Sequence, residues 1–172
     1  MFFNQKKNQT AFTLIELLLY VGIFSVLMLT VSAFLNVVIQ AKEKRQVISE
    51  VEYQGANIAY FISHNIKAAS GITSPILGAN NSTLTLSSAD STRNPTVFKL
   101  INGAIAINLA NGSDIVLNNN QVTASNFICY NFGKTGTSGS INCQFTLSAS
   151  DASNRHEYSY TKKFNVSVSR RY

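Results

Sequence analysis

Residues 11–41 read AFTLIELLLYVGIFSVLMLTVSAFLNVVIQA, and this stretch decides the fold. After Glu16, residues 17–41 contain no Asp, Glu, Lys or Arg. A helix of this length rises roughly 37 Å at about 1.5 Å per residue, which exceeds the hydrocarbon thickness of about 30 Å. The stretch therefore predicts a membrane-spanning helix.

Glu16 is the exception at the mouth of this apolar run, because an ionisable side chain there is costly unless it finds a partner. A cleaved secretory signal would use Val31-Ser32-Ala33 as its cleavage site, but the apolar run continues to Ile39. An ordinary membrane anchor explains the run and gives Glu16 no purpose. A buried core helix of this length would be expected to carry charges. A fourth interpretation gives Glu16 a role.

Ala11-Phe12-Thr13-Leu14-Ile15-Glu16 resembles the processing site of type IV pilins and pseudopilins. The resemblance implies that prepilin peptidase cleaves between Ala11 and Phe12, and that Phe12 is then N-methylated. It also implies that Glu16 is the charge that directs assembly with other pilins. Ala11 stands where the family usually has Gly; as the smallest alternative it is expected to fit a site that excludes bulk, and whether cleavage is slower stays open. Residues 1–11 would be a cytoplasmic leader, and residues 12–41 the transmembrane and assembly half of a helix.

The remaining composition fits one globular domain behind an anchor, with 172 residues and a formal charge of +6. Loss of the leader removes two lysines and leaves +4, an excess too mild to indicate nucleic acid by itself. Lys42, Lys44 and Arg45 directly follow the apolar run and suit the lipid headgroups. Because basic residues lie on both sides of the span, charge does not decide its orientation. The family resemblance implies a single pass through the cytoplasmic membrane, with an exported C-terminal domain.

Residues 42–70 predict an amphipathic continuation of the same helix, ending near Ala69 with Gly71 as its C-cap. The residues expected on its inner face recur at spacings of three and four: Ile48, Val51, Gly55, Ile58, Ile62 and Ile66. Gly22 and Gly55 are expected to be the weak points of the helix.

Residues 71–172 predict an exported antiparallel β domain, rich in Ser, Thr, Asn and Gly. The six or seven expected strands cover residues 84–86, 97–101, 104–108, 114–117, 122–130, 141–147 and 158–169. Asn102-Gly103 suits a type I′ hairpin turn, and a bulge is expected at Lys162-Lys163. The fold class is α+β, with a long N-terminal helix packed on one meander-like sheet. In order and pattern the chain is most similar to the larger J-type and W-type minor pilins.

Cys129 and Cys143 fall in neighbouring predicted strands. In an exported domain a disulfide is favoured over two buried free thiols. A zinc site is not indicated, since only two Cys are present and His64 and His156 lie far from them in sequence.

No catalytic constellation and no cofactor motif is recognisable, so an enzyme is not indicated. Two function classes stay open. One is a structural subunit that prepilin peptidase processes and that joins or caps a type IV pilus, or a type II secretion or competence pseudopilus. The other is a membrane-tethered binding module, an adhesin or DNA receptor, with a passive anchor. For nucleic acid the candidate residues are Lys162, Lys163, Arg170 and Arg171, which an edge strand would also use to avoid aggregation.

Overall fold

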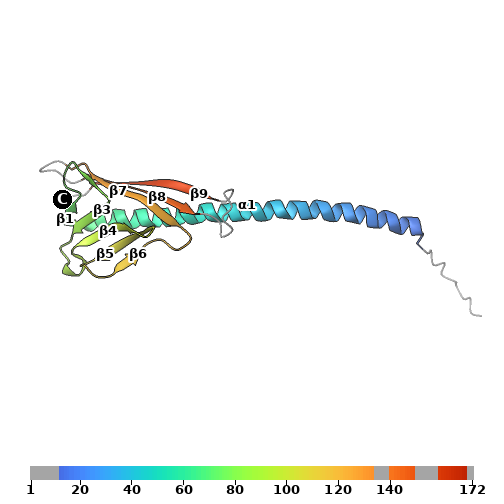
Figure 1. Ribbon diagram of the computed structural model, residues 1–172, viewed down its shortest axis with the longest axis horizontal. Helices are drawn as coiled ribbons and strands as arrows, with labels where there is room; N and C mark the ends of the chain where they lie inside the picture. Colours follow the sequence, from blue (N-terminus) through green and yellow to red (C-terminus); the bar gives the residue numbers. More distant parts are fainter. Residues whose placement is uncertain (1–11, 134–139, 150–158, 170–172) are drawn as a thin grey trace, which may run out of the picture. The chain divides into compact units, whose positions relative to one another are not determined.

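The computed structural model describes residues 12–133, 140–149 and 159–169. One helix, α1 (Leu14–Ala68), precedes all the strands (Figure 1). Contacts within the chain divide it into two compact units between Lys42 and Glu43. The predicted α+β fold, a long helix followed by antiparallel strands, is confirmed.

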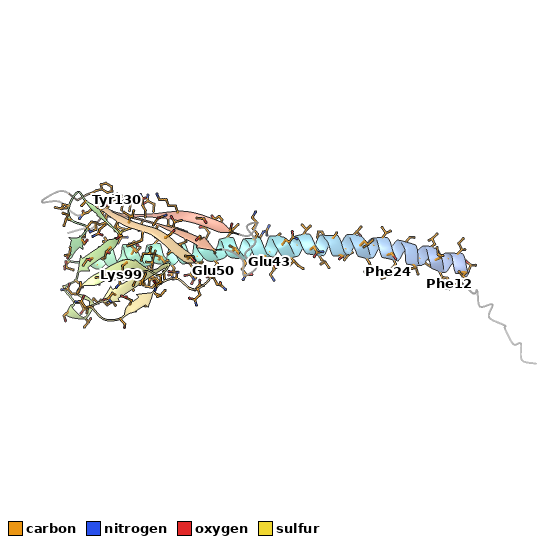
Figure 2. All side chains as sticks on the ribbon, in the orientation of Figure 1. Phe12, Phe24, Glu43, Glu50, Lys99 and Tyr130 are labelled. Atoms are coloured by element: carbon orange, nitrogen blue, oxygen red, sulfur yellow. A yellow bond between two sulfur atoms is a disulfide. The ribbon has the colours of Figure 1, made fainter. Side chains whose placement is uncertain are left out.

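In the first unit, α1 is long and apolar enough to cross a membrane. Its large apolar side chains are exposed on all sides, including Phe24 and Leu29, and Figure 2 shows such side chains along this part of α1. Ser25, Thr30 and Asn36 donate hydrogen bonds to backbone carbonyls of the preceding turn. Their polar groups therefore have partners without water, as a lipid environment requires.

The second unit contains two antiparallel sheets. The five-stranded sheet has the order β1-β3-β4-β5-β6, with β1 (Gly71–Ser74), β3 (Thr83–Ser87), β4 (Thr96–Ile101), β5 (Ala104–Leu109) and β6 (Asp114–Val116). The four-stranded sheet has the order β2-β7-β8-β9, with β2 (Asn80–Asn81), β7 (Thr123–Asn131), β8 (Ser140–Ala149) and β9 (Tyr160–Ser169). A 3-10 turn, η1 (Ser91–Arg93), lies between β3 and β4.

The core of this unit lies between α1 and the two sheets. Most of the predicted inner face of α1 is fully buried, namely Val51, Gly55, Ile58, Ile62 and Ile66, while Ile48 is half-buried. These side chains share one cluster with residues of both sheets, among them Leu84, Phe98, Ile105, Phe127, Ile141 and Phe145. The apolar stripe of α1 thus covers the inner faces of both sheets, as half-buried sheets require.

Gly55 is buried because α1 approaches the ring of Phe164 at this point. A Cβ atom at position 55 would clash with that ring. The ring is also held from its other sides, since it stacks on Phe145 with centroids 5.3 Å apart and lies under Lys162 Nζ. Packing against Phe164 therefore requires a glycine at position 55. The sequence predicted a weak point of the helix at Gly55 and did not predict this contact. At Gly22, in contrast, a Cβ atom would have no atom within 4 Å of it.

Several sequence expectations need correction. The strands form two sheets, and the sequence did not predict β1, which begins at the residue expected to cap the helix, or β2, which has only two residues. The helix ends at Ala68, and Gly71 begins β1 in place of capping the helix. The hairpin turn at Asn102-Gly103 is confirmed, with φ angles of 48° and 75° between β4 and β5.

The bulge expected at Lys162-Lys163 is absent. Strand β9 pairs with β8 without a shift in register from Tyr160 to Ser169. Every second residue of β9 faces inward, including Lys162, whose charge is met by Glu52 at 2.6 Å. The predicted bulge rested on the charge of Lys162, which lies on the same face as Tyr160 and Phe164 and does not interrupt the alternation of the strand. The described irregularities lie elsewhere, in β1 and in β7 between Ser125 and Ile128.

Candidate functional site

The candidate site is the first turn of α1. Thr13 directly precedes the helix, and its carbonyl oxygen accepts hydrogen bonds from the backbone N–H groups of Glu16 at 3.1 Å and Leu17 at 3.2 Å. Its hydroxyl oxygen lies 3.4 Å from the Glu16 nitrogen. Thr13 and Glu16 thus have the spacing of a capping box, in which a threonine precedes the helix and a glutamate follows three residues later.

Sequence reasoning missed Thr13, although the Thr-x-x-Glu pattern was available as a signal. Besides its role in capping, this placement puts the Glu16 carboxylate in the first turn, where the partial positive charge of the helix N-terminus favours an anion. The local sequence therefore lowers part of the cost of a carboxylate at the start of an apolar helix.

Glu16 has a further neighbour on the same helix face. The Tyr20 hydroxyl donates a hydrogen bond to Glu16 Oε1 at 3.4 Å. The Tyr20 ring also meets the Phe12 ring edge-on, with centroids 6.3 Å apart. Phe12 itself is 72% exposed, so the residue expected to become the N-terminus is not packed into a core.

Residues 6–32 match the family model of the prokaryotic N-terminal methylation motif. The matched segment contains Ala11, Phe12 and Glu16 and more than half of the apolar run. This motif supports a type IV pilin-like protein, and it implies processing by prepilin peptidase and association with pilins. Its family is structural and not enzymatic, and together with the apolar helix it indicates membrane anchoring. No curated protein and no solved structure gives a significant match to the chain.

The residues proposed to be processed are only partly described. Glu16 lies in the first turn of α1 and Phe12 lies just before the helix, whereas Ala11 lies outside the described residues. Cleavage and methylation stay predictions that rest on the motif.

The two cysteines form the expected disulfide. Cys129 in β7 and Cys143 in β8 are direct partners across the two strands, with Cα atoms 4.0 Å apart, and both are fully buried. The bridge joins the two central strands of the four-stranded sheet. Such a bridge is typical of proteins in oxidising compartments.

The candidate basic residues are not gathered on one described surface. Lys162 faces inward and contacts Glu52 of α1, while Lys163 is exposed on the opposite side of β9. Arg170 and Arg171 lie outside the described residues. A four-residue basic patch stays a prediction, and Lys163 is its only member that is described and unpaired.

Glu52 forms a polar clamp between α1 and β9, which sequence reasoning missed. Its carboxylate accepts hydrogen bonds from Lys162 Nζ at 2.6 Å and from the Tyr160 hydroxyl at 3.0 Å. The hydrogen bond from Lys162 lowers the pKa of Glu52 below its ordinary value, and the same contact raises the pKa of Lys162. Hydrogen bonding to Glu52 likewise raises the pKa of Tyr160.

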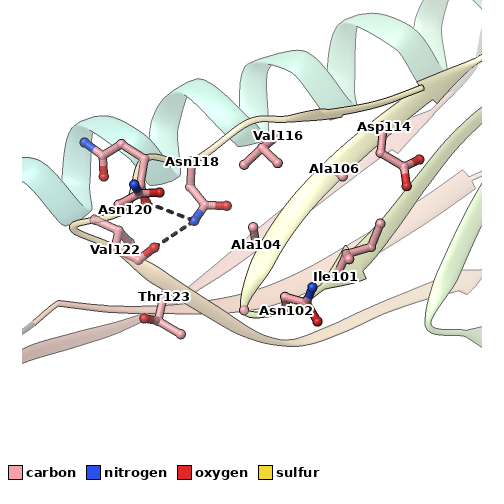
Figure 3. Close-up of a pocket in the computed structure, with 12 residues that line it drawn as sticks. Ile101, Asn102, Ala104, Ala106, Asp114, Val116, Asn118, Asn120, Val122 and Thr123 are labelled. Carbon is pink, nitrogen blue, oxygen red and sulfur yellow. Dashed lines mark hydrogen bonds between the residues drawn. The ribbon is translucent and has the colours of Figure 1, made fainter. Parts of the chain in front are cut away.

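A shallow cleft of about 420 Å³ lies beside the β4–β5 turn and the segment that follows β6 (Figure 3). Ala104 and Ala106 contribute small apolar side chains, and Asn102, Asn120 and Asp114 contribute polar ones. A hydrogen bond from Asn108, and to a smaller extent one from Lys99, holds the pKa of Asp114 below its ordinary value, so the carboxyl is ionised at neutral pH. The Asp114 carboxylate is paired with Lys99 Nζ at 3.0 Å, so the charge beside the cleft is already compensated within the chain.

Among the residues that the structure describes, no cluster of three or more His, Cys, Asp or Glu side chains is arranged to hold a metal ion.

Proposed function

We propose that the protein is a minor pilin or pseudopilin, a structural subunit of a type IV pilus or of a type II secretion or competence pseudopilus. In this proposal prepilin peptidase removes residues 1–11, and N-methylation of Phe12 follows. Residues 12–41 then serve membrane insertion and assembly, residues 42–70 support the domain, and residues 71–172 form the exported part. The single observation that carries the proposal is the match of residues 6–32 to the methylation motif. Glu16 lies within this match and in the first turn of an exposed apolar helix.

Export of the C-terminal domain through a single pass of the cytoplasmic membrane is supported by the buried Cys129–Cys143 bridge, because cytosolic thiols are kept reduced. The larger J-type or W-type subunits, which cap or lie near the tip of a filament, are the proposed subtype. This choice rests on the order of elements in the sequence.

Glu16 is the proposed assembly residue. Cleavage would create an amine on Phe12, one helical turn from the Glu16 carboxylate. A neighbouring subunit in the same membrane would bring a second amine to the same depth. Because charges in hydrocarbon are poorly screened, an unpaired partner is costly, and this cost favours subunits in the matched axial position.

Two measurements test the proposal. The intact mass of the membrane-extracted protein should correspond to a chain that begins at N-methylated Phe12. Glu16→Ala and Glu16→Gln should be inserted and cleaved like the wild type. Crosslinking in the same membranes should show that they join filaments at least about tenfold less than the wild type, equivalent to ~1.4 kcal/mol. Glu43→Gln is the matched control, since Glu43 lies on the same helix beyond the apolar run. An intact Met1, or a chain that begins after Ala33, would contradict the proposed processing.

The alternative is a membrane-tethered binding module, an adhesin or DNA receptor. The observation in its favour is the cleft beside Asn102 and Asn120, whose amides can hydrogen-bond an uncharged polar ligand. Equal incorporation of the wild type and Glu16→Ala would favour this alternative, because a passive anchor has no use for the carboxylate.

A further inference from the structure

Tyr20 is the neighbour of Glu16 that the methylation motif leaves without a role. Its hydroxyl lies 3.4 Å from Glu16 Oε1, and its ring meets the ring of Phe12. Glu16 and Tyr20 are four residues apart and so lie on one face of α1, and Phe12, which precedes the helix, meets this face through its ring. Tyr20 thereby contacts both residues that the proposed assembly step uses.

The hydrogen bonds of the apolar unit set Tyr20 apart. Ser25, Thr30 and Asn36 each donate to a backbone carbonyl of their own helix. Within the described residues 12–42, the hydrogen bond that joins two side chains is the one from Tyr20 to Glu16. A phenol in this position gives the carboxylate a donor from its own subunit, where water is absent.

After cleavage, the Glu16 carboxylate would have two donors in its own subunit, the Tyr20 hydroxyl and the amine of Phe12. Side chains on a helix lean toward its N-terminus, which would bring the Glu16 carboxylate toward the amine of its own Phe12 after cleavage. Tyr20 lies one turn further along the helix, and its hydroxyl is a donor that competes with this amine for the Glu16 carboxylate. Its ring reaches back over this face to Phe12, at a centroid distance of 6.3 Å.

We propose that Tyr20 is a positioning residue, whose hydroxyl competes with the subunit's own N-terminus for the Glu16 carboxylate and so keeps this carboxylate available to the amine of a neighbour. This inference rests on the proposed assembly role of Glu16. When the hydroxyl is lost, the amine of the same subunit becomes the competing donor, self-pairing increases and fewer subunits join filaments.

Tyr20→Phe tests the inference, because it removes the hydroxyl and keeps the ring against Phe12. Full-length wild type, Tyr20→Phe and Glu16→Gln are compared in the same membranes, with Tyr53→Phe as the control for an exposed tyrosine of the same helix. Tyr20→Phe should be inserted and cleaved normally and should join filaments about tenfold less, the size expected for losing one hydrogen bond to a charged group.

Infrared spectroscopy of the protein labelled with ¹³C-glutamate supplies a readout that loss of packing alone would not move. The band of Glu16 is the one missing from Glu16→Gln. This band should shift in Tyr20→Phe and stay in place in Tyr53→Phe.

The outcomes separate the inference from the proposal on which it rests. Normal incorporation of Tyr20→Phe, or an unmoved Glu16 band, overturns the role of Tyr20, while failure of Glu16→Gln still supports the assembly role of Glu16. Normal incorporation of Glu16→Gln overturns both. Reduced incorporation together with a shifted band supports the positioning role.

Discussion

The side chain at position 11 decides how fast the precursor is processed, if the methylation motif is used as proposed. Ala11 adds one methyl group where the family usually has none, and we expect Ala11→Gly to be cleaved at least as fast as the wild type. Ala11→Leu should block cleavage, because a site that excludes bulk cannot accept a branched side chain. Pulse-chase labelling of precursor and mature protein measures both rates, and Thr10→Ala is the control that leaves the junction unchanged. Cleavage of Ala11→Leu at the wild-type rate would contradict this explanation.

The Cys129–Cys143 bridge should stabilise the β domain by restricting its unfolded chain. A loop of about 15 residues corresponds to roughly 3 kcal/mol. The double variant Cys129→Ala, Cys143→Ala should therefore unfold at a lower urea concentration than the oxidised wild type. Peptide mapping without reductant should find the two cysteine peptides linked. Alkylation of both thiols in unreduced protein would argue against the bridge and against export.

Among the elements, the contact between α1 and β9 is the most sensitive to added volume. Gly55→Ala places a methyl group against the Phe164 ring, which Phe145 and Lys162 keep from moving freely. We expect a loss of about 1–3 kcal/mol in the free energy of unfolding, despite the higher helix propensity of Ala. Gly22→Ala is the matched control, because its methyl group would meet no atom. Phe164→Leu should restore part of the stability of Gly55→Ala, and an unchanged urea midpoint for Gly55→Ala would show that the packing is looser than described.

The clamp between Glu52 and Lys162 should make the same contact sensitive to pH. Since the folded pKa of Glu52 is lowered, its contribution to stability is present above the ordinary value near 4.5 and is lost as the pH falls through the lowered folded value. The advantage of the wild type over Glu52→Gln in urea midpoint should therefore shrink below about pH 4.5, and it should be small in concentrated salt, because both side chains of the pair are 40% exposed to solvent. Glu43→Gln serves as the control. A midpoint difference that stays constant from neutral to acidic pH would mean that the charge of Glu52 contributes nothing.

These two contacts also show how far periodicity reaches as a predictor. The spacing of Ile58, Ile62 and Ile66 was enough to predict the buried face of α1, and Asn102-Gly103 was enough to predict a hairpin turn. Periodicity does not reveal which segments meet in space, so the partnership of Gly55 with Phe164 and of Glu52 with Lys162 went unpredicted. The division into two sheets was missed for the same reason. At the candidate site the local pattern singled out Glu16, whereas the role proposed for Tyr20 rests on side-chain geometry that the pattern does not contain.

For the molecule as a whole, the long exposed apolar run and the buried core belong to different units. The exposed apolar run from Leu14 to Ile39 lies in the unit before Glu43, and every residue of the buried core lies after it. The chain can therefore be divided between the two units without removing a residue of the core. This separation is what a subunit needs if it is first held in a membrane and later drawn into a filament.

A fragment of residues 43–172 should be soluble and should unfold cooperatively in urea, because it keeps the α1 face that includes Val51 and Ile58 together with both sheets. Ile58→Asp in the same fragment should prevent folding, since it puts an unpaired charge at a fully buried position. Tyr53→Asp, at an exposed position on the same helix, should leave the fold intact. Circular dichroism and urea titration measure all three. If the fragment aggregates while the full-length protein folds, the domain needs residues before Glu43 to fold. The membrane helix would then be part of the folding unit as well as its anchor.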